Sequence, residues 1–162
     1  MDIFISKEED KFLGGIMKTN KPIGKLYTSN VEGLKRIDFD ADVYLITRAG
    51  YDVNGTKRLK GLSPSPDLFQ RYVLKWKDSG NPEKWWPYYE KFFLEELKTE
   101  EKLKDLRCIY KELIRGKNIV LVCFCKNHKY CHRSLVADFF LKYGVESIEL
   151  NPVDYEPIYL DL

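Results

Sequence analysis

The sequence predicts an open α/β fold, in which a mostly parallel Rossmann-like or flavodoxin-like sheet has helices on both faces. Three short apolar runs, rich in β-branched residues, lie at 25–30, 42–48 and 119–125. Amphipathic helical segments separate the second run from the third, and another follows the third. The chain has 162 residues, of which 44% are hydrophobic. This length favours one domain, spanning 1–162, over two.

Two central strands are predicted in the first half of the chain. Residues 25–30, KLYTSN, form the first, which ends in the polar pair Ser29 and Asn30. Residues 42–48, DVYLITR, form the second, which ends at Arg48. Both runs are short and rich in β-branched or aromatic residues, as strands are.

Less regular segments flank these strands. Ile3–Ile5 is a short strand or an edge piece, and residues 31–37 are a short helix or a loop. Residues 49–66 are rich in Gly, Asn, Ser, Pro and basic residues, which predicts a loop. An ordered loop of this length in a small domain is more often functional than not.

Three helices are predicted between the second and third strands. The first runs from about Ser65 to Ser79. In the second, Asn81 is the N-cap and Pro82 is the first helical residue, where proline is well tolerated. The third begins near Thr99, and Gly116 ends it.

The most informative stretch follows. Residues 119–125, IVLVCFC, carry no charge and read as a buried parallel strand. After a polar loop, the CHRS sequence at 131–134 begins a helix with apolar residues on one face, and Gly144 closes it. Residues 146–150 form a last strand, and residues 151–162 form a tail that packs on the core.

These residues resemble a known family. The strand sequence LVC, which ends at Cys123, is followed eight residues on by CHRSL, then by Ala-Asp and by Gly-Val before the last strand. Upstream similarity lies in Gly61–Ser65 with Asp67 and Leu68, in Trp85 or Trp86, in Phe92, and in Glu96 with Leu97. Together these motifs are similar to domain of unknown function 488 (DUF488). The resemblance implies an α/β fold and a site at the start of the CHRS helix, and it implies no particular reaction.

A ligand site is expected at the carboxyl ends of the strands, where open α/β sheets bind ligands. The start of the CHRS helix lies at the same edge, and its free backbone N–H groups favour anions. The residues predicted to bind the ligand are Ser29, Asn30, Arg48, Tyr51, Lys126, His128, His132, Arg133 and Ser134. Arg133 suits a phosphate or a carboxylate. The alternative for Arg133 is an internal salt bridge to an acid such as Asp38 or Asp42.

Cys131 and His132 are the candidate catalytic residues. A cysteine at a helix N-terminus is expected to have a lowered pKa and to be nucleophilic. His132 is either a general acid or base, or a ring stacked in the core. Cys123 reads as a small buried core residue. Zinc held by Cys123, Cys125, His128, Cys131 and His132 is less favoured, because the sequence offers no second ligand pair. We therefore expect no metal and no other cofactor.

The favoured function is capture or sequestration of a phosphorylated, nucleotide-like ligand, such as a signalling nucleotide. One alternative is an enzyme that acts on a nucleotide or nucleoside through Cys131 and His132. Another is binding or processing of nucleic acid through the basic loop after the second strand. The net charge of +2 gives this last alternative little support.

The chain is expected to be cytoplasmic and to have no membrane partner. No apolar run approaches the length that spans a bilayer, and the charged N-terminal residues do not form a signal peptide. In that compartment the four cysteines are expected to be reduced thiols, metal ligands or reactive groups. The sequence does not indicate an oligomeric state.

Overall fold

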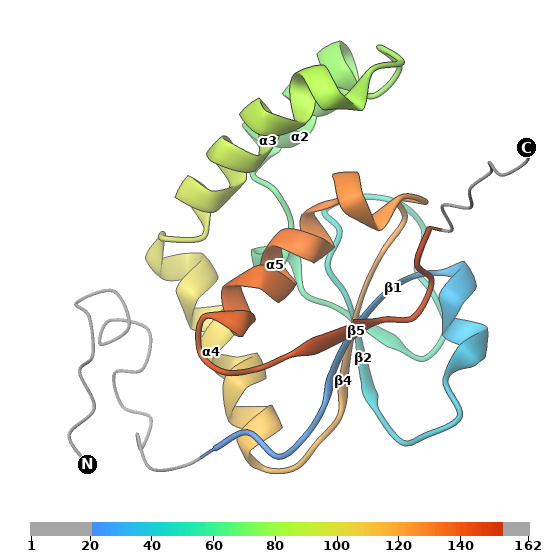
Figure 1. Cartoon of the computed structure of the whole chain (residues 1–162), viewed down its shortest axis with the longest axis vertical. Coiled ribbons are helices and arrows are strands. Elements are labelled where there is room, and N and C mark those ends of the chain that lie inside the picture. The colour runs from blue at the N-terminus through green and yellow to red at the C-terminus, as the bar shows by residue number, and fades with distance from the viewer. Residues whose placement is uncertain (1–20, 154–162) are drawn as a thin grey trace, which may run out of the picture.

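The computed structural model describes residues 21–153, which form an open α/β sheet (Figure 1). Its strands are β1 (Leu26–Asn30), β2 (Asp42–Leu45), β3 (Thr56–Arg58), β4 (Ile119–Cys123) and β5 (Ser147–Glu149). They lie in the order β3-β2-β4-β1-β5, and every neighbouring pair is parallel. The predicted fold class is therefore confirmed. The predicted strand at Ile3–Ile5 and most of the predicted tail lie outside the described residues.

The α-helices are α2 (Pro66–Arg71), α3 (Pro82–Glu96), α4 (Glu100–Ile114) and α5 (His132–Leu141). Three short 3-10 helices are η1 (Glu32–Arg36), η2 (Lys60–Leu62) and η4 (His128–Tyr130). The first predicted long helix is α2 continued by a π-helical turn, η3 (Tyr72–Trp76). Figure 1 shows α4 and α5 on the same side of the sheet, with α2 and α3 projecting from it together. No helix in residues 21–153 combines the length and the apolar character needed to cross a bilayer.

The helix starts follow from local sequence. Pro66 and Pro82 both occupy the first turn of their helices, α2 and α3, where a missing N–H costs nothing. Ser65 caps α2, because its side chain accepts a hydrogen bond from the backbone N–H of Leu68. Asn81 is the N-cap of α3 as predicted, although its side chain makes no capping hydrogen bond.

The stretch 49–66 is more ordered than the predicted loop, because it contains β3 and η2. β3 consists of Thr-Lys-Arg and pairs in parallel with β2 at the edge of the sheet. An edge strand this short and polar has no apolar alternation, which is why the sequence pattern gave no sign of it.

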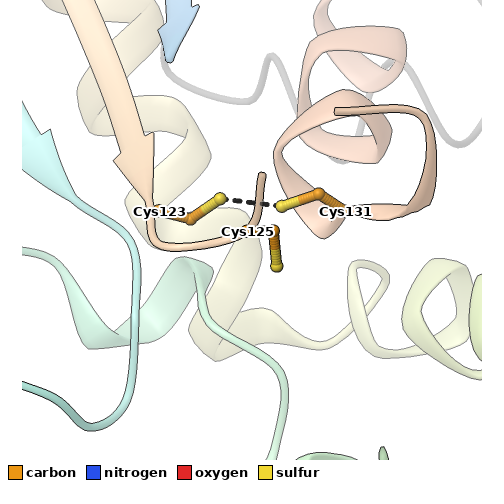
Figure 2. Close-up of side chains that lie close together, drawn as sticks. All are labelled: Cys123, Cys125 and Cys131. Carbon is orange, nitrogen blue, oxygen red and sulfur yellow. Dashed lines mark hydrogen bonds between the residues drawn. The ribbon is translucent and has the colours of Figure 1, made fainter. Parts of the chain in front are cut away.

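The β4–α5 connection brings three cysteines together (Figure 2). Cys123 is the last residue of β4, Cys125 follows in the loop, and Cys131 is the N-cap of α5. The three sulfur atoms all lie within 4.8 Å of one another. The short crossing from strand to helix therefore places all three thiols at the carboxyl end of the sheet.

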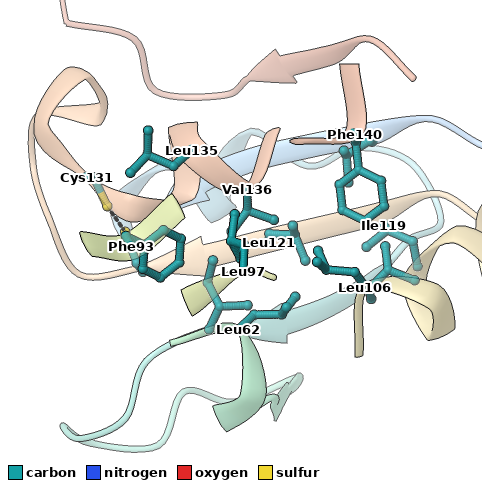
Figure 3. Close-up of a cluster of buried hydrophobic side chains, with 14 of the residues drawn as sticks. Leu62, Phe93, Leu97, Leu106, Ile119, Leu121, Cys131, Leu135, Val136 and Phe140 are labelled. Carbon is teal, nitrogen blue, oxygen red and sulfur yellow. Dashed lines mark hydrogen bonds between the residues drawn. The ribbon is translucent and has the colours of Figure 1, made fainter. Parts of the chain in front are cut away.

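The two faces of the sheet are covered unequally. Alternate residues of β4, among them Ile119 and Leu121, pack on the layer formed by α3, α4 and α5 (Figure 3). The residues between them, Val120 and Val122, face a smaller cluster covered by η1 and nearby loops. Because both faces of β4 are buried, its sequence is apolar throughout.

Candidate functional site

A cavity of about 340 Å³ lies at the carboxyl ends of β2 and β4. The segments that follow these strands contribute Thr47, Arg48 and the residues from Cys123 to Cys125. The start of α5 contributes Cys131 and His132. The opposite wall comes from α2, η3 and α3. The cavity is thus bounded by the carboxyl ends of β2 and β4, by the start of α5 and by the helices that project from the sheet.

The wall formed by the helices is aromatic. Phe69, Tyr72 and Tyr89 line it, and Tyr130 of η4 completes it. The rings of Tyr72 and Tyr89 meet edge to face, with centroids 5.9 Å apart. Burial raises the pKa of Tyr72 to about 12 and that of Tyr89 well above its usual value. Both hydroxyls are therefore protonated at neutral pH and are able to donate hydrogen bonds.

The three thiols line the same cavity. Burial opposes ionisation of Cys123, but hydrogen bonds from Cys125 and Cys131 and the charge of Arg133 outweigh it, so the pKa of Cys123 lies well below its usual value. Burial, together with the neighbouring Cys123, raises the pKa of Cys131. Of the three thiols, Cys123 is therefore the one that loses its proton most readily. The lowered pKa that the sequence suggested for Cys131 is corrected accordingly, because Cys123 is the sulfur that faces the guanidinium.

Arg133 is fully buried and makes an ion pair. Its Nε donates to Glu149 Oε1 at 3.0 Å, and its Nη2 donates to Glu149 Oε2 at 3.2 Å. Its Nη1 donates to Cys123 Sγ at 3.0 Å and to the carbonyl of Cys125 at 2.9 Å. Arg133 is thus held by protein groups instead of facing the cavity as an anion ligand. The internal salt bridge considered from sequence is present, with Glu149 as the acid in place of Asp38 or Asp42.

His132 has the core packing that was one of the two alternatives left open by the sequence. Its ring packs edge-on against Phe93, with centroids 5.5 Å apart. Its Nε2 lies 2.6 Å from the carbonyl of Ile46, so Nε2 carries the proton and donates it there. Nδ1 is then unprotonated and lies 3.9 Å from Cys131 Sγ. Burial lowers the pKa of His132, so the ring is neutral at ordinary pH.

Arg48 supplies a cation to the cavity lining. Its Nε donates to the carbonyl of Pro64 at 2.8 Å. No acceptor among the described residues pairs with its two terminal nitrogens. Lys77, at the end of η3, also lines the cavity. None of the lining residues is acidic.

Arg58 of β3 orders the loop that carries Arg48. Its guanidinium donates to the side chain of Thr47 at 2.8 Å and to the carboxylate of Asp52 at 3.2 Å. It also donates to four backbone carbonyls of the loop, those of Thr47, Ala49, Gly50 and Tyr51. The wall next to β2 is therefore held in place by one half-buried side chain.

Four other predicted ligand residues, Tyr51, Lys126, His128 and Ser134, do not line the cavity. Tyr51 is 64% exposed and packs on the lining ring of Phe124, with centroids 4.8 Å apart. Lys126 lies in an adjoining depression that shares Tyr72, Cys125 and Tyr130 with the main cavity. His128 begins η4, and burial lowers its pKa. Ser134 turns back to the carbonyl of Cys131 at 2.8 Å and does not line the cavity.

Ser29 and Asn30 stabilise the turn after β1 through side-chain hydrogen bonds. The Ser29 hydroxyl donates to the carbonyl of Asn30 at 2.7 Å. The side-chain oxygen of Asn30 accepts hydrogen bonds from Gly33 N–H at 3.0 Å and from the Asn151 amide at 2.8 Å. Both residues are buried and neither lines the cavity. The carboxyl end of β1 therefore lies beside the site instead of forming its wall.

The sequence reasoning missed most of the aromatic wall and Lys77. Tyr72 and Tyr89 were not among the predicted ligand residues, and the helical spacing of the aromatic residues around them fits packing between helices equally well. A π-helical turn at 72–76 changes the spacing at which side chains share one side of the helix, and no sequence pattern predicts it.

The comparisons with known proteins give one match. No curated protein and no solved structure matches this chain. A family model described as the active DUF488-N3 subclade, DUF488-N3a, matches residues 26–144. The matched segment begins at the first residue of β1 and contains β4, the three cysteines and the whole of α5. The chain therefore belongs to the DUF488 family, in its DUF488-N3a subclade.

Proposed function

We propose that this chain binds a phosphorylated, nucleotide-like molecule in the cavity at the ends of β2 and β4. The main support for the proposal is the positive charge of the residues that line the cavity. Arg48 and Lys77 both line the cavity, no acidic residue does, and the terminal nitrogens of Arg48 have no acceptor in residues 21–153. An anionic group with several oxygens, such as a phosphate, satisfies such donors best.

The aromatic wall accounts for the rest of the ligand. Phe69, Tyr72, Tyr89 and Tyr130 offer flat apolar surfaces within reach of the two cations. Aromatic side chains stack on nucleobases of any sequence, because every base has a π face. A volume of about 340 Å³ is within the range of small-molecule sites.

The role we propose is capture of the ligand without turnover. The pair suggested by sequence for catalysis is Cys131 with His132, and their Sγ and Nδ1 atoms lie 3.9 Å apart. Burial raises the pKa of the thiol and lowers that of the imidazole. Neither group is therefore activated in the way that a nucleophile and its base require.

One observation favours an enzyme as the second candidate. Cys123 lines the cavity, and its pKa is lowered by neighbouring thiols and by Arg133, against the effect of burial. A thiolate in contact with a bound ligand is a competent nucleophile. The matched subclade is also described as active. In this alternative the nucleophile is Cys123 instead of Cys131.

Calorimetric titration with matched compounds tests the proposal. The series is a nucleoside, its monophosphate, a cyclic nucleotide and inorganic phosphate. We expect the phosphorylated nucleosides to bind more tightly than the nucleoside or phosphate alone. Arg48→Ala removes a charge-assisted contact of about 1.5–3 kcal/mol, which is roughly one to two decades of affinity. Arg115→Ala, which changes an exposed arginine, is the control.

Equal affinity of Arg48→Ala and the wild type for every phosphorylated compound contradicts the proposed site. Mass analysis of the ligand after incubation and denaturation separates the two roles. Recovery of intact ligand supports capture, whereas a new product whose formation stops in Cys123→Ser supports the enzyme. Binding only to oligonucleotides, with a steep dependence on salt, identifies a nucleic-acid partner instead.

A further inference from the structure

We propose that Cys123, Cys125 and Cys131 bind one thiophilic metal ion, for which Zn²⁺ is best suited, at the inner wall of the cavity. Their sulfur atoms lie within 4.8 Å of one another (Figure 2). A Zn–S bond of about 2.3 Å in a tetrahedral site separates sulfur atoms by about 3.8 Å. Cys123 Sγ and Cys131 Sγ, now 2.7 Å apart, separate by about 1 Å to hold the ion.

The fold supplies the three ligands from a rigid frame. Cys123 ends the central strand β4, and Cys131 is the N-cap of α5. Both are almost completely buried, so packing restricts their backbones. Cys125 lies on the loop between them and is half-buried, which leaves it freer to adjust to an ion. Three sulfurs brought together in this way are a soft donor set that selects zinc-like ions over magnesium or calcium.

The buried guanidinium of Arg133 gives independent support. Its Nη1 lies 3.0 Å from Cys123 Sγ and 2.9 Å from the carbonyl of Cys125, so one nitrogen fixes two of the three ligand residues. Hydrogen bonds of this kind orient metal ligands and are part of most metal sites. Its positive charge also offsets part of the negative charge of three thiolates bound to a divalent ion. Glu149 in turn holds the guanidinium in place.

The fourth coordination position faces the cavity. Three protein ligands with one open position are typical of zinc sites that act on a bound molecule, whereas purely structural sites are closed by four. His132 Nδ1 lies 3.9 Å from Cys131 Sγ, but His132 does not belong to the compact donor group. The open position is therefore available to water or to a donor atom of the bound molecule. The inference does not depend on which molecule that is.

Metal titration of the reduced full-length chain tests the inference. The protein is reduced with a phosphine, which does not itself compete for the ion as a thiol does, and is titrated with Cd²⁺ or Zn²⁺. Thiolate-to-cadmium charge-transfer absorption reports sulfur coordination, and native mass spectrometry gives the stoichiometry. We expect one ion for each chain and an absorption intensity matching three thiolates.

The cysteine variants identify the ligands. Cys125→Ser is expected to lower the affinity for Cd²⁺ by at least about 100-fold. Loss of a residue that only hydrogen-bonds to a metal ligand lowers affinity by about 10–100-fold, and loss of a ligand itself should cost no less than the upper end of that range. Cys123→Ser and Cys131→Ser are expected to do the same. Cys108→Ser, which changes the exposed cysteine of α4, is the matched control and leaves affinity unchanged. Circular dichroism checks that each variant is folded. Because Cys125 is only half-buried, Cys125→Ser should disturb the core least of the three.

Two results overturn the inference. In the first, the reduced wild type binds no Cd²⁺ stoichiometrically, or Cys125→Ser binds it as tightly as the wild type does. In the second, Cys123 and Cys131 are joined by a disulfide in the purified protein, and their reduction yields no metal binding. Because these measurements use the metal alone, they fail or succeed separately from the nucleotide titrations.

Discussion

Replacing Glu149 with glutamine tests the electrostatic arrangement behind the thiols. Glu149 accepts two hydrogen bonds from Arg133, and it also accepts from the Thr28 hydroxyl at 2.8 Å and from the Asn151 N–H at 3.1 Å. The guanidinium is completely buried and the carboxylate side chain is 14% exposed. Removing one partner of such a pair leaves a buried charge uncompensated, which costs about 3–5 kcal/mol.

The lower half of that range applies here, for two reasons. Arg133 keeps its bonds to Cys123 and to the carbonyl of Cys125, and glutamine retains one acceptor oxygen. We therefore expect Glu149→Gln to reduce the free energy of unfolding by about 3 kcal/mol. For a chain of this size, such a loss lowers the melting temperature by roughly 6–12 °C.

Urea unfolding followed by circular dichroism is the appropriate assay, with Glu146→Gln as the control. Glu146 is exposed in the same segment and makes no ion pair or hydrogen bond with Arg133, so its substitution should leave the midpoint unchanged. In a double-mutant cycle, Arg133→Met combined with Glu149→Gln should cost less than the sum of the single changes, because neither charge of the pair remains. Additive effects, or a normal midpoint for Glu149→Gln, refute this account of the buried pair.

Three further predictions concern the walls of the cavity and the core beneath it. Arg58→Ala should expose residues 47–52 to proteases and to hydrogen exchange, because it removes the donors to their carbonyls. Phe93→Ala should reduce the free energy of unfolding by about 3–5 kcal/mol in urea, since the ring is completely buried against His132. Stability should fall as pH rises above 10 and through about 12, because Tyr72 binds its proton more tightly when folded than when unfolded. In Tyr72→Phe this fall, measured by urea unfolding at successive pH values, should be shallower.

The sequence was most informative where local pattern alone determines structure. The apolar run at 119–125 and the helix after Cys131 were both predicted, because a strand buried on both faces and an amphipathic helix each have a distinct periodicity. Pro66 and Pro82 marked the starts of two helices, because proline is well tolerated in the first turn of a helix. The position of the cavity, at the carboxyl ends of the strands, was then expected from the parallel arrangement of the sheet.

Prediction was weaker where a residue depends on a distant partner. Arg133 was correctly placed at the start of α5, but its partner, Glu149, comes from β5 on the far side of β1. Only the sheet order reveals that this carboxylate reaches the start of the helix, and a single sequence does not give that order. Asp38 and Asp42 were plausible partners by composition, and nothing in the local pattern distinguishes them from Glu149.

The partner of Arg133 also determines where a negatively charged ligand is best stabilised. A buried guanidinium that is paired with a carboxylate contributes little net field to the cavity, because the two charges act in opposite directions at nearly the same place. The terminal nitrogens of Arg48 and the ammonium of Lys77 have no such compensation within residues 21–153. In the proposed site, the attraction for an anion therefore comes from the wall next to β2 and from the end of η3, and the thiols occupy the wall at β4 and α5. In the site that we propose, a ligand held by its phosphate at the first wall and by its base on the aromatic residues has its remaining atoms facing the thiols or a metal ion bound to them.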